Sequence, residues 1–297
     1  MAARQKCSVY EGARIKVMMF QINWKLKSII YRILSLFNLY SLLFFIQKKI
    51  TKRSNINLKK IVFYWDYHFE YLKKNNSKKV LEIGAGKSLA QNIYLSYKFN
   101  QNLEQTLIDV SNMIDFELIN KANEQISQIL GVAKIPYVNT LTDLKEKFNI
   151  NYLAPMRLDQ VVENQFKFDA CISSSTLEHI SIKQLDEYLS LLKKIIKKNG
   201  IVSAAIDYSD HYSHTDKNIT NLNFLKFSNN EWKKYNTPML FQNRLRHQNY
   251  RKLFKSKGYE IFEIKGNYGE NPGYVSKEFD LDDKETFMLW GYFLLKQ

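Results

Sequence analysis

From about residue 78 onward, short apolar runs alternate with longer stretches of helical periodicity, and this alternation limits the fold more than any other feature. Strands buried on both faces form continuous apolar runs, whereas covering helices show apolar residues every three or four positions. Seven short runs occur, at residues 80–83, 107–108, 150–154, 168–172, 201–206, 259–264 and 287–295. The pattern predicts a parallel α/β sheet with helices on both faces.

One crossover helix can be predicted in detail between the fourth and fifth runs. Ser181 and Gln184 form a capping box that starts it. An apolar stripe then recurs at spacings of three and four, at Ile182, Leu185, Leu189, Leu192 and Ile196. We expect the helix to end in a left-handed turn at Asn199-Gly200, directly before the fifth strand.

Most of the net charge of +15 falls on the stretch from residue 1 to residue 60. This stretch holds 13 Lys and Arg side chains against one acid, Glu11, whereas positions 61–297 hold 31 bases and 28 acids. The remainder is nearly neutral, which disfavours a broad nucleic-acid-binding face. We therefore expect an extension over residues 1–60 and one domain over residues 61–297. Two cysteines, too few for a disulfide framework, favour a reducing, cytoplasmic location.

Residues 29–46 form an apolar run with lysines on both sides. Polar residues interrupt it every three positions, at Arg32, Ser35, Asn38 and Ser41, and so lie along one side of a helix. A basic amphipathic helix of this kind is typical of peripheral membrane contact. We expect residues 25–53 to touch the inner face of a membrane. The alternatives are packing on the rest of the chain or across a dimer, and a membrane span.

A strand running into a glycine turn occupies residues 80–88, Val-Leu-Glu-Ile-Gly-Ala-Gly-Lys-Ser. Gly84 and Gly86 allow a sharp turn and close approach to a ligand. Several nucleotide cofactors bind such loops, and a plain turn is the alternative. Asp109 ends the next apolar run after the one that contains Glu82, and an acid at that place can hold both ribose hydroxyls.

The fourth strand runs from Phe168 through three serines and Thr176 into Leu177-Glu178-His179-Ile180. With the glycine loop and Asp109, this order resembles the class I S-adenosylmethionine-dependent methyltransferases, over roughly residues 60 to 297. The resemblance implies a doubly wound, mostly parallel, seven-stranded Rossmann-like sheet whose last strand is antiparallel between strands five and six. An N-terminal helical extension would precede it.

The resemblance also implies S-adenosylmethionine as the cofactor and assigns residues to it. The methionine end would contact Glu82, Gly84, Ala85 and Gly86. Asp109 would hold the ribose, Val110 and Ser111 would flank the adenine, and Ala154 would help to cover it. Ser173 and Ser174 would line the sulfonium side. Ser88 replaces the usual third glycine, which weakens a nicotinamide-dependent oxidoreductase as an alternative.

The fifth run leads into Asp-Tyr-Ser-Asp-His-Tyr-Ser-His-Thr-Asp at residues 207–216, the start of a predicted acceptor-side insertion over about 207–245. Imidazoles and carboxylates beyond a strand's carboxyl end suit general-base work on a hydroxyl or amine. His211 is the first candidate base, followed by Asp207 and His214. His179 and Asp210 are candidates for acceptor binding. A plain polar loop, or a metal site of His211, His214 and the acids, are the alternatives.

Glu178-His179 resembles the end of a Glu-x-x-Glu-His metal site found in some methyltransferases. Ser175 stands at the position of the first glutamate, so we expect no metal.

Residues 232–250 resemble bacterial methyltransferases associated with surface-polysaccharide and glycolipid pathways. Asn243, Arg244 and Arg246 lie in this stretch, and we expect all three to bind the acceptor. The guanidinium groups of the two arginines suit a carboxylate or a phosphate. The alternative is a helix start with solvated arginines. The predicted function is methyl transfer to an oxygen or nitrogen of a small-molecule or glycan-precursor acceptor. An RNA methyltransferase and a non-catalytic binding module remain alternatives, and no nucleic-acid partner is favoured.

Overall fold

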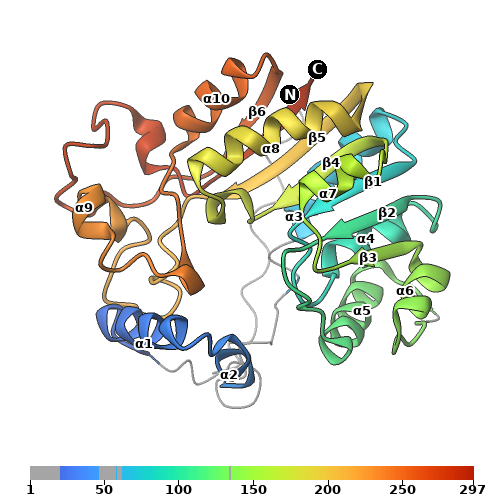
Figure 1. Cartoon of the computed structure of the whole chain (residues 1–297), viewed down its shortest axis with the longest axis horizontal. Coiled ribbons are helices and arrows are strands. Elements are labelled where there is room, and N and C mark those ends of the chain that lie inside the picture. The colour runs from blue at the N-terminus through green and yellow to red at the C-terminus, as the bar shows by residue number, and fades with distance from the viewer. Residues whose placement is uncertain (1–20, 47–57, 59–61, 134) are drawn as a thin grey trace.

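A computed structural model describes residues 21–46, 58, 62–133 and 135–297 of the chain (Figure 1). Its centre is a seven-stranded sheet of order β3-β2-β1-β4-β5-β7-β6. The strands are β1 Lys79–Ile83, β2 Glu104–Ile108, β3 Ile150–Leu153, β4 Phe168–Ser174, β5 Ile196–Asp207, β6 Glu260–Lys265 and β7 Trp290–Lys296. β1 to β5 are parallel, and β7 lies antiparallel between β5 and β6. The predicted seven-stranded, mostly parallel α/β fold is confirmed.

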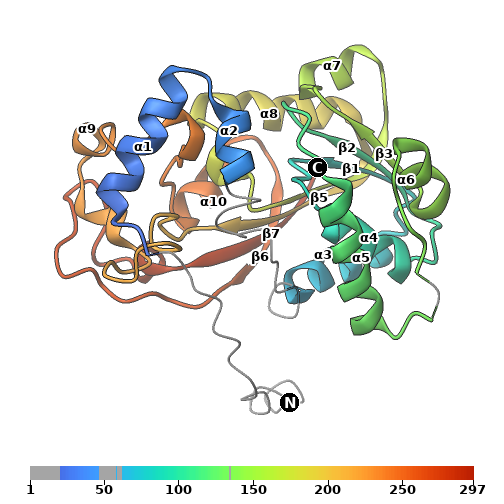
Figure 2. The ribbon, with the colours of Figure 1, turned by 90° about the horizontal axis from the view of Figure 1, so that it is seen from below.

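Helices cover both faces of this sheet, as Figure 2 shows. One face carries α3 Val62–Lys74, α4 Ala90–Lys98, α5 Phe116–Leu130 and α6 Leu141–Phe148. The other carries α7 Leu158–Glu163, α8 Ile182–Ile195 and α10 His247–Ser256. Successive residues of β1 alternate between the two cores, with Val80 packed in the first and Leu81 in the second. The sheet is therefore a middle layer between two layers of helices.

The crossover helix α8 begins as predicted but ends earlier. Ser181 accepts a hydrogen bond from the backbone N–H of Gln184 in the expected capping box. The helix stops at Ile195, and Ile196 is already extended and pairs with Phe168 of β4. The predicted left-handed end at Asn199-Gly200 is wrong, because strand pairing and an ion pair between Lys197 and Asp169 extend β5 backwards.

The apolar run at residues 29–46 forms two helices, α1 Trp24–Leu36 and α2 Tyr40–Phe45. Asn38 separates them with a left-handed φ of 54°. Of the helices in the described ranges, none is both long and apolar enough to cross a bilayer. The basic residues 48–53, part of the predicted membrane contact, lie outside the described ranges, as do residues 1–20.

One side of α1 packs on the segment that follows β5, although the two segments are far apart in the sequence. Trp24 is 5% exposed and shares a core with Tyr212 and Trp232. Its backbone N–H donates to Asp216 at 2.9 Å, and Arg32 donates to the carbonyls of Lys233 and Lys234. Packing on the rest of the chain, one of the sequence-based alternatives, therefore holds for this side.

The opposite side of α1 and α2 presents apolar side chains to solvent. We call this the α1 stripe; its members are 39–74% exposed and are Leu26, Ile29, Ile30, Ile33, Leu36, Phe37, Leu39, Leu42 and Phe45. The α1 members recur at spacings of three and four, so they form one continuous face.

Candidate active site

The residues that the sequence singles out gather at the carboxyl edge of the sheet. Because β1 to β5 are parallel, their carboxyl ends meet at one edge, where open α/β sheets bind ligands. The glycine loop follows β1, Asp109 follows β2, Ala154 follows β3, Ser173 and Ser174 end β4, and Asp207 ends β5. The residues predicted to bind the cofactor thus share one edge of the sheet with Asp207.

The turn after β1 needs its glycines. Gly84 has φ +79° and Gly86 has φ +72°, both in the left-handed region that L side chains rarely adopt. A Cβ atom at Gly84 would lie 2.4 Å from Thr176, whereas nothing lies within 4 Å of one at Gly86. Gly84 is therefore required by packing, and Gly86 leaves backbone open to a ligand.

Glu82 lies just before this turn and is 3% exposed. Gln91 donates to its Oε1 at 3.0 Å, and Asn92 donates to its Oε2. Burial raises the pKa of Glu82 to about 7, although these two amide hydrogen bonds act in the opposite direction. The carboxyl group is thus fixed in place and titrates near neutrality.

Asp109 connects the turns after β2 and β3. Its carbonyl accepts the backbone N–H of Met156 at 2.8 Å, and its Oδ1 accepts that of Ser111 at 3.3 Å. Burial raises the pKa of Asp109, while backbone N–H groups of the glycine loop and of its own turn lower it. Val110, beside it, is 64% exposed, so an apolar surface adjoins the carboxylate.

The two serines at the end of β4 have different partners. Ser173 is 2% exposed and donates to the Ile83 carbonyl at 3.3 Å. Ser174 donates to Gln91 at 2.6 Å and lies 2.8 Å from His68 Nε2. His68 also contacts Ser203, which places a buried imidazole behind the end of β4.

His68, Gln91 and Asn92 were not predicted from the sequence, although all three support the predicted site. Gln91 and Asn92 lie on the first turn of α4, directly after the glycine loop, and His68 lies on α3, before the first strand. Two polar residues at the buried start of a helix are a signal that could have identified the amides. Nothing in the sequence around His68 distinguishes it.

Three histidine rings lie in contact beyond β4 and β5. The ring of His211 lies between those of His179 and His214, at centroid distances of 4.9 and 5.0 Å. His211 Nε2 is 3.4 Å from Asp207 Oδ2, close enough for an ion pair but without a hydrogen bond in place. Burial raises the pKa of Asp207, but contacts with His211 and Ser209 outweigh it and leave the pKa below the usual value.

Glu178 faces this histidine cluster from η3, Leu177–His179. It is 3% exposed, and neither carboxylate oxygen has a hydrogen-bond partner within the described ranges. Burial, and then the charge of Asp207, raise the pKa of Glu178 well above its usual value. Glu178 was not among the site residues predicted from the sequence.

Asp210 points into the fold. It is fully buried, and its Oδ1 accepts the backbone N–H of Tyr212 at 2.8 Å. Burial raises the pKa of Asp210 to about 6. This carboxylate organises the turn that carries His211, so a structural role replaces the predicted contact with the acceptor.

Arg246 and Arg244 are also occupied by the chain itself. Arg246 is 1% exposed and donates to the carbonyls of Thr286, Tyr208 and Met288. Arg244 is 6% exposed and donates to the carbonyls of Phe224 and Phe227. Neither guanidinium is open to an anion, because buried carbonyls need these donors. Arg246 holds together the segments next to β5 and β7, and Arg244 holds together parts of the insertion. These structural roles replace the prediction of acceptor binding.

Asn243 is likewise hydrogen-bonded to backbone carbonyls of the chain. Its amide donates to the carbonyls of Leu177 and Ile180, both at 2.9 Å. Asn243 therefore fixes the η3 turn that carries Glu178 and His179, and it acts on the site through that turn.

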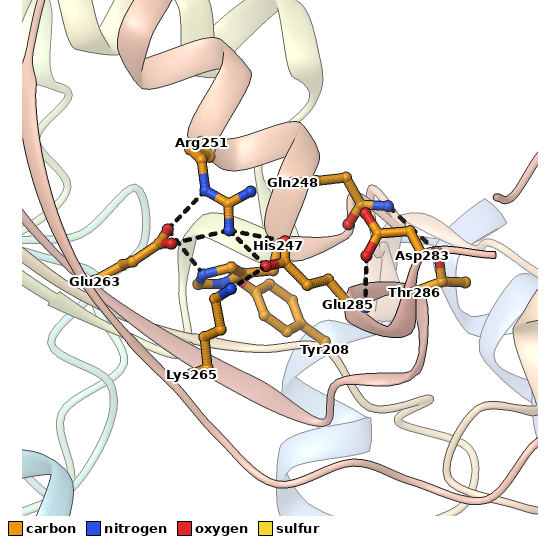
Figure 3. Close-up of polar contacts among 9 residues, drawn as sticks. All are labelled: Tyr208, His247, Gln248, Arg251, Glu263, Lys265, Asp283, Glu285 and Thr286. Atoms are coloured by element: carbon orange, nitrogen blue, oxygen red, sulfur yellow. Dashed lines mark hydrogen bonds and ion pairs between the residues drawn. The ribbon is translucent and has the colours of Figure 1, made fainter. Parts of the chain in front are cut away.

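A charged network holds α10 against β6, as Figure 3 shows. Arg251 pairs with Glu263 and Glu285, and Lys265 pairs with Glu285. His247 joins the network through Glu263 at 3.1 Å and reaches the Tyr208 hydroxyl at 2.9 Å. Since Tyr208 follows Asp207, the network fixes the carboxyl end of β5.

A cavity of about 270 Å³ lies elsewhere, between α3 and the β6–β7 pair. Its lining includes Glu260 at the start of β6 and Lys296 at the end of β7. Lys296 pairs with Ile201 near the beginning of β5, so the cavity is at the opposite end of the sheet. It does not belong to the candidate site.

No protein-family model and no curated protein matches the sequence. Solved structures similar to it include the plantazolicin methyltransferase BpumL in complex with SAH, at 13% identity and a TM-score of 0.49 over 92% of this chain and 97% of that one. Another is an S-adenosylmethionine-dependent methyltransferase from Clostridium acetobutylicum, at 15% identity. Its TM-score is 0.42, over 86% of this chain and 98% of that one.

A third is the CurJ carbon methyltransferase, at 15% identity and a TM-score of 0.41 over 73% of this chain. The chain spans about half, 47%, of that protein's length. Likeness at this level concerns the fold alone, so any function has to follow from the site.

Proposed function

We propose that this protein is an S-adenosylmethionine-dependent methyltransferase acting on an oxygen or nitrogen of a small-molecule or glycan-precursor acceptor. One observation carries the proposal: the Gly84 turn and the Asp109 carboxylate lie side by side at the carboxyl edge of the sheet, where the Gly84 N–H donates to the Ile108 carbonyl at 3.0 Å. The antiparallel β7 between β5 and β6 supports it, since the resemblance implied that arrangement.

The edge offers complementary groups for each part of the cofactor. The Asp109 carboxylate suits the two ribose hydroxyls, and exposed Val110 suits a flat adenine face. Glu82, once ionised, suits the cationic amino group of the methionine end. Open space at Gly86 lets the ligand approach the backbone.

The acceptor would bind on the β4–β5 side, next to the histidine cluster. As the acceptor's oxygen or nitrogen bonds to the methyl carbon, the carbon–sulfur bond breaks and sulfur keeps the electron pair as a thioether. The acceptor proton passes to the His211–Asp207 pair, whose carboxylate is held ionised. The sulfonium is already activated, so alignment of the reactants is the protein's main task.

A sugar hydroxyl or amine on a glycan precursor is the acceptor class we favour. Arg244 and Arg246 are buried, so the acceptor does not need a carboxylate or a phosphate to pair with them. The α1 stripe and the basic segment at residues 25–53 would bring the domain to an anionic membrane surface that holds a lipid-linked acceptor.

Calorimetric titration with S-adenosylhomocysteine tests the cofactor assignment. We expect micromolar binding by the wild type and loss of binding in Asp109→Ala. Asp186→Ala is the matched control, because Asp186 is an exposed carboxylate on α8 that pairs with Lys257. Absence of binding by well-folded wild-type protein would overturn the proposal, and so would equal loss in both variants.

A further inference from the structure

Three side chains with metal-ligating atoms meet beside the proposed acceptor position. One potential ligand atom each from Glu178, His179 and His211 lies within 4.8 Å of the other two. Glu178 and His179 come from η3 after β4, and His211 comes from the loop after the neighbouring strand β5. Two adjacent strand ends thus contribute to one cluster at the ligand-binding edge of the sheet.

The cluster contains buried polar atoms without partners. Both carboxylate oxygens of Glu178 are buried and accept no hydrogen bond, and His211 Nε2 has no hydrogen-bond partner either, among the residues that the structure describes. A buried carboxylate without donors is costly, because it has lost its water without compensation. A cation between these atoms would satisfy all of them at once.

The surrounding contacts suit metal ligation. His179 Nδ1 lies 2.6 Å from the Phe241 carbonyl, so this nitrogen donates and Nε2 keeps its lone pair for the cluster. Ligating histidines usually donate their other N–H to a carbonyl or carboxylate in this way. Asn243 fixes the same turn through the carbonyls of Leu177 and Ile180.

We infer that Glu178, His179 and His211 bind a divalent first-row transition-metal cation, with zinc as the type case. Two imidazoles and one carboxylate form a donor set typical of catalytic zinc sites, and they leave a coordination position open. A tetrahedral zinc ion holds its ligand atoms roughly 3.4 Å apart, so side-chain adjustments on the order of 1 Å would close the site.

This inference replaces the expectation of no metal, which rested on Ser175. The third ligand is His211, which the sequence separates from Glu178 by a whole strand and helix. Its consequence for catalysis rests on the proposed function: the open position would take an acceptor hydroxyl and lower its pKa. With His211 Nε2 engaged as a ligand, Asp207 would receive the proton.

Cobalt substitution tests the site without requiring activity. Chelator-stripped full-length protein is titrated with Co²⁺ while the visible d–d absorption is recorded, and bound metal is counted by elemental analysis. We expect one ion per chain and intense bands typical of low coordination number. Glu178→Gln and His211→Asn should each weaken Co²⁺ binding at least about 100-fold, whereas His214→Asn should keep it. His214 is the matched control, because it stacks on His211 but lies outside the three-ligand cluster.

Thermal unfolding and S-adenosylhomocysteine titration of every variant separate the two proposals. Metal loss with retained folding and cofactor binding supports the site. A wild type that binds no Co²⁺, or a His214→Asn variant as defective as His211→Asn, overturns it whatever the cofactor titration shows. Should Glu178→Gln fail to fold, His211→Asn alone decides the question.

Discussion

Gly84 and Thr176 are packed so closely that an added Cβ on the glycine would lie 2.4 Å from both Thr176 Oγ1 and Thr176 Cγ2. The threonine hydroxyl also donates to the Gly84 carbonyl at 3.3 Å. Because the two residues follow β1 and β4, this contact fixes the two turns between which the cofactor is proposed to bind.

Gly84→Ala should therefore weaken S-adenosylhomocysteine binding and destabilise the fold. The left-handed backbone alone costs roughly 1–2 kcal/mol for a non-glycine residue, and the clash with Thr176 adds to it. Chemical denaturation and calorimetry provide both readouts.

Gly86→Ala is the matched control, because Gly86 has a similar φ and open space around it. It should destabilise the fold less than Gly84→Ala does. Adding Thr176→Ala to Gly84→Ala should restore part of the stability. If the two glycine variants are equally stable, the Thr176 contact is not the cause of the instability of Gly84→Ala.

Arg246→Lys should destabilise the protein strongly, by about 3 kcal/mol or more. The guanidinium serves three buried carbonyls, and one ammonium group cannot reach all of them, so unpaired acceptors remain at roughly 1–3 kcal/mol each. Urea unfolding measures the loss. Arg157→Lys, at an exposed pair with Asp159, should leave the midpoint unchanged. A stable Arg246→Lys protein with a raised KM for the acceptor would instead restore the original substrate-binding prediction.

The main architecture could be predicted because it depends on local patterns. Apolar runs predicted the strand positions, and the capping box at Ser181 predicted where α8 begins. The end of α8 could not be predicted, since pairing of Ile196 with Phe168 outweighs the local signal of Asn199-Gly200. The break in the N-terminal helix was missed for a related reason: an asparagine tolerates a left-handed φ but does not require one.

The positions of the residues proposed to bind the cofactor were easier to predict than the positions of those proposed to bind the acceptor. Gly84 and Asp109 sit at strand ends, so the strand pattern alone places them at one edge. Charged side chains in the insertion carry no such information. Arg246 could equally bind an anion or satisfy buried carbonyls, and only tertiary packing decides. Glu178 and His211 become one cluster only through the adjacency of β4 and β5.

Affinity for S-adenosylhomocysteine should rise with pH from about 6 to 8 and then level off. Burial raises the pKa of Glu82 to about 7, so the carboxyl is largely protonated at pH 6 and cannot pair with the ligand's amino group. Binding should be roughly tenfold weaker at pH 6 than at pH 8. Calorimetry across this range tests the prediction, and Glu82→Gln should flatten the profile. An unchanged profile in that variant would assign the pH dependence to another group.

His68 should make the fold acid-sensitive. Burial between Ser203 and Ser174 lowers its pKa to about 3, from about 6.5 in the unfolded chain. The unfolded state therefore binds a proton that the folded state does not, so stability is full above pH 6.5 and falls as the pH drops towards 3. The free energy of unfolding then falls by up to about 1.4 kcal/mol per pH unit. Urea unfolding between pH 7 and 4 should show a shallower slope in His68→Gln, whereas equal slopes would mean that His68 does not titrate as described.

The exposed α1 stripe should bind anionic vesicles. Its apolar side chains would enter the interfacial region, while the basic N-terminal segment would meet the lipid headgroups. Deleting the segment is a poor test, because Trp24 and Tyr31 belong to the core. The double variant Ile33→Asp/Phe37→Asp leaves those contacts in place and should lower cosedimentation with phosphatidylglycerol vesicles at least tenfold, since it removes two apolar anchors and adds two negative charges.

Leu141→Asp is the control for this experiment, because Leu141 is 50% exposed at the start of α6, outside the stripe. It should sediment like the wild type, and uncharged phosphatidylcholine vesicles should bind all proteins weakly. Equal binding of the stripe variant and the wild type would rule out this surface as the membrane contact. Strong binding of the wild type to uncharged vesicles would instead show that insertion of the stripe, without charge attraction, is sufficient.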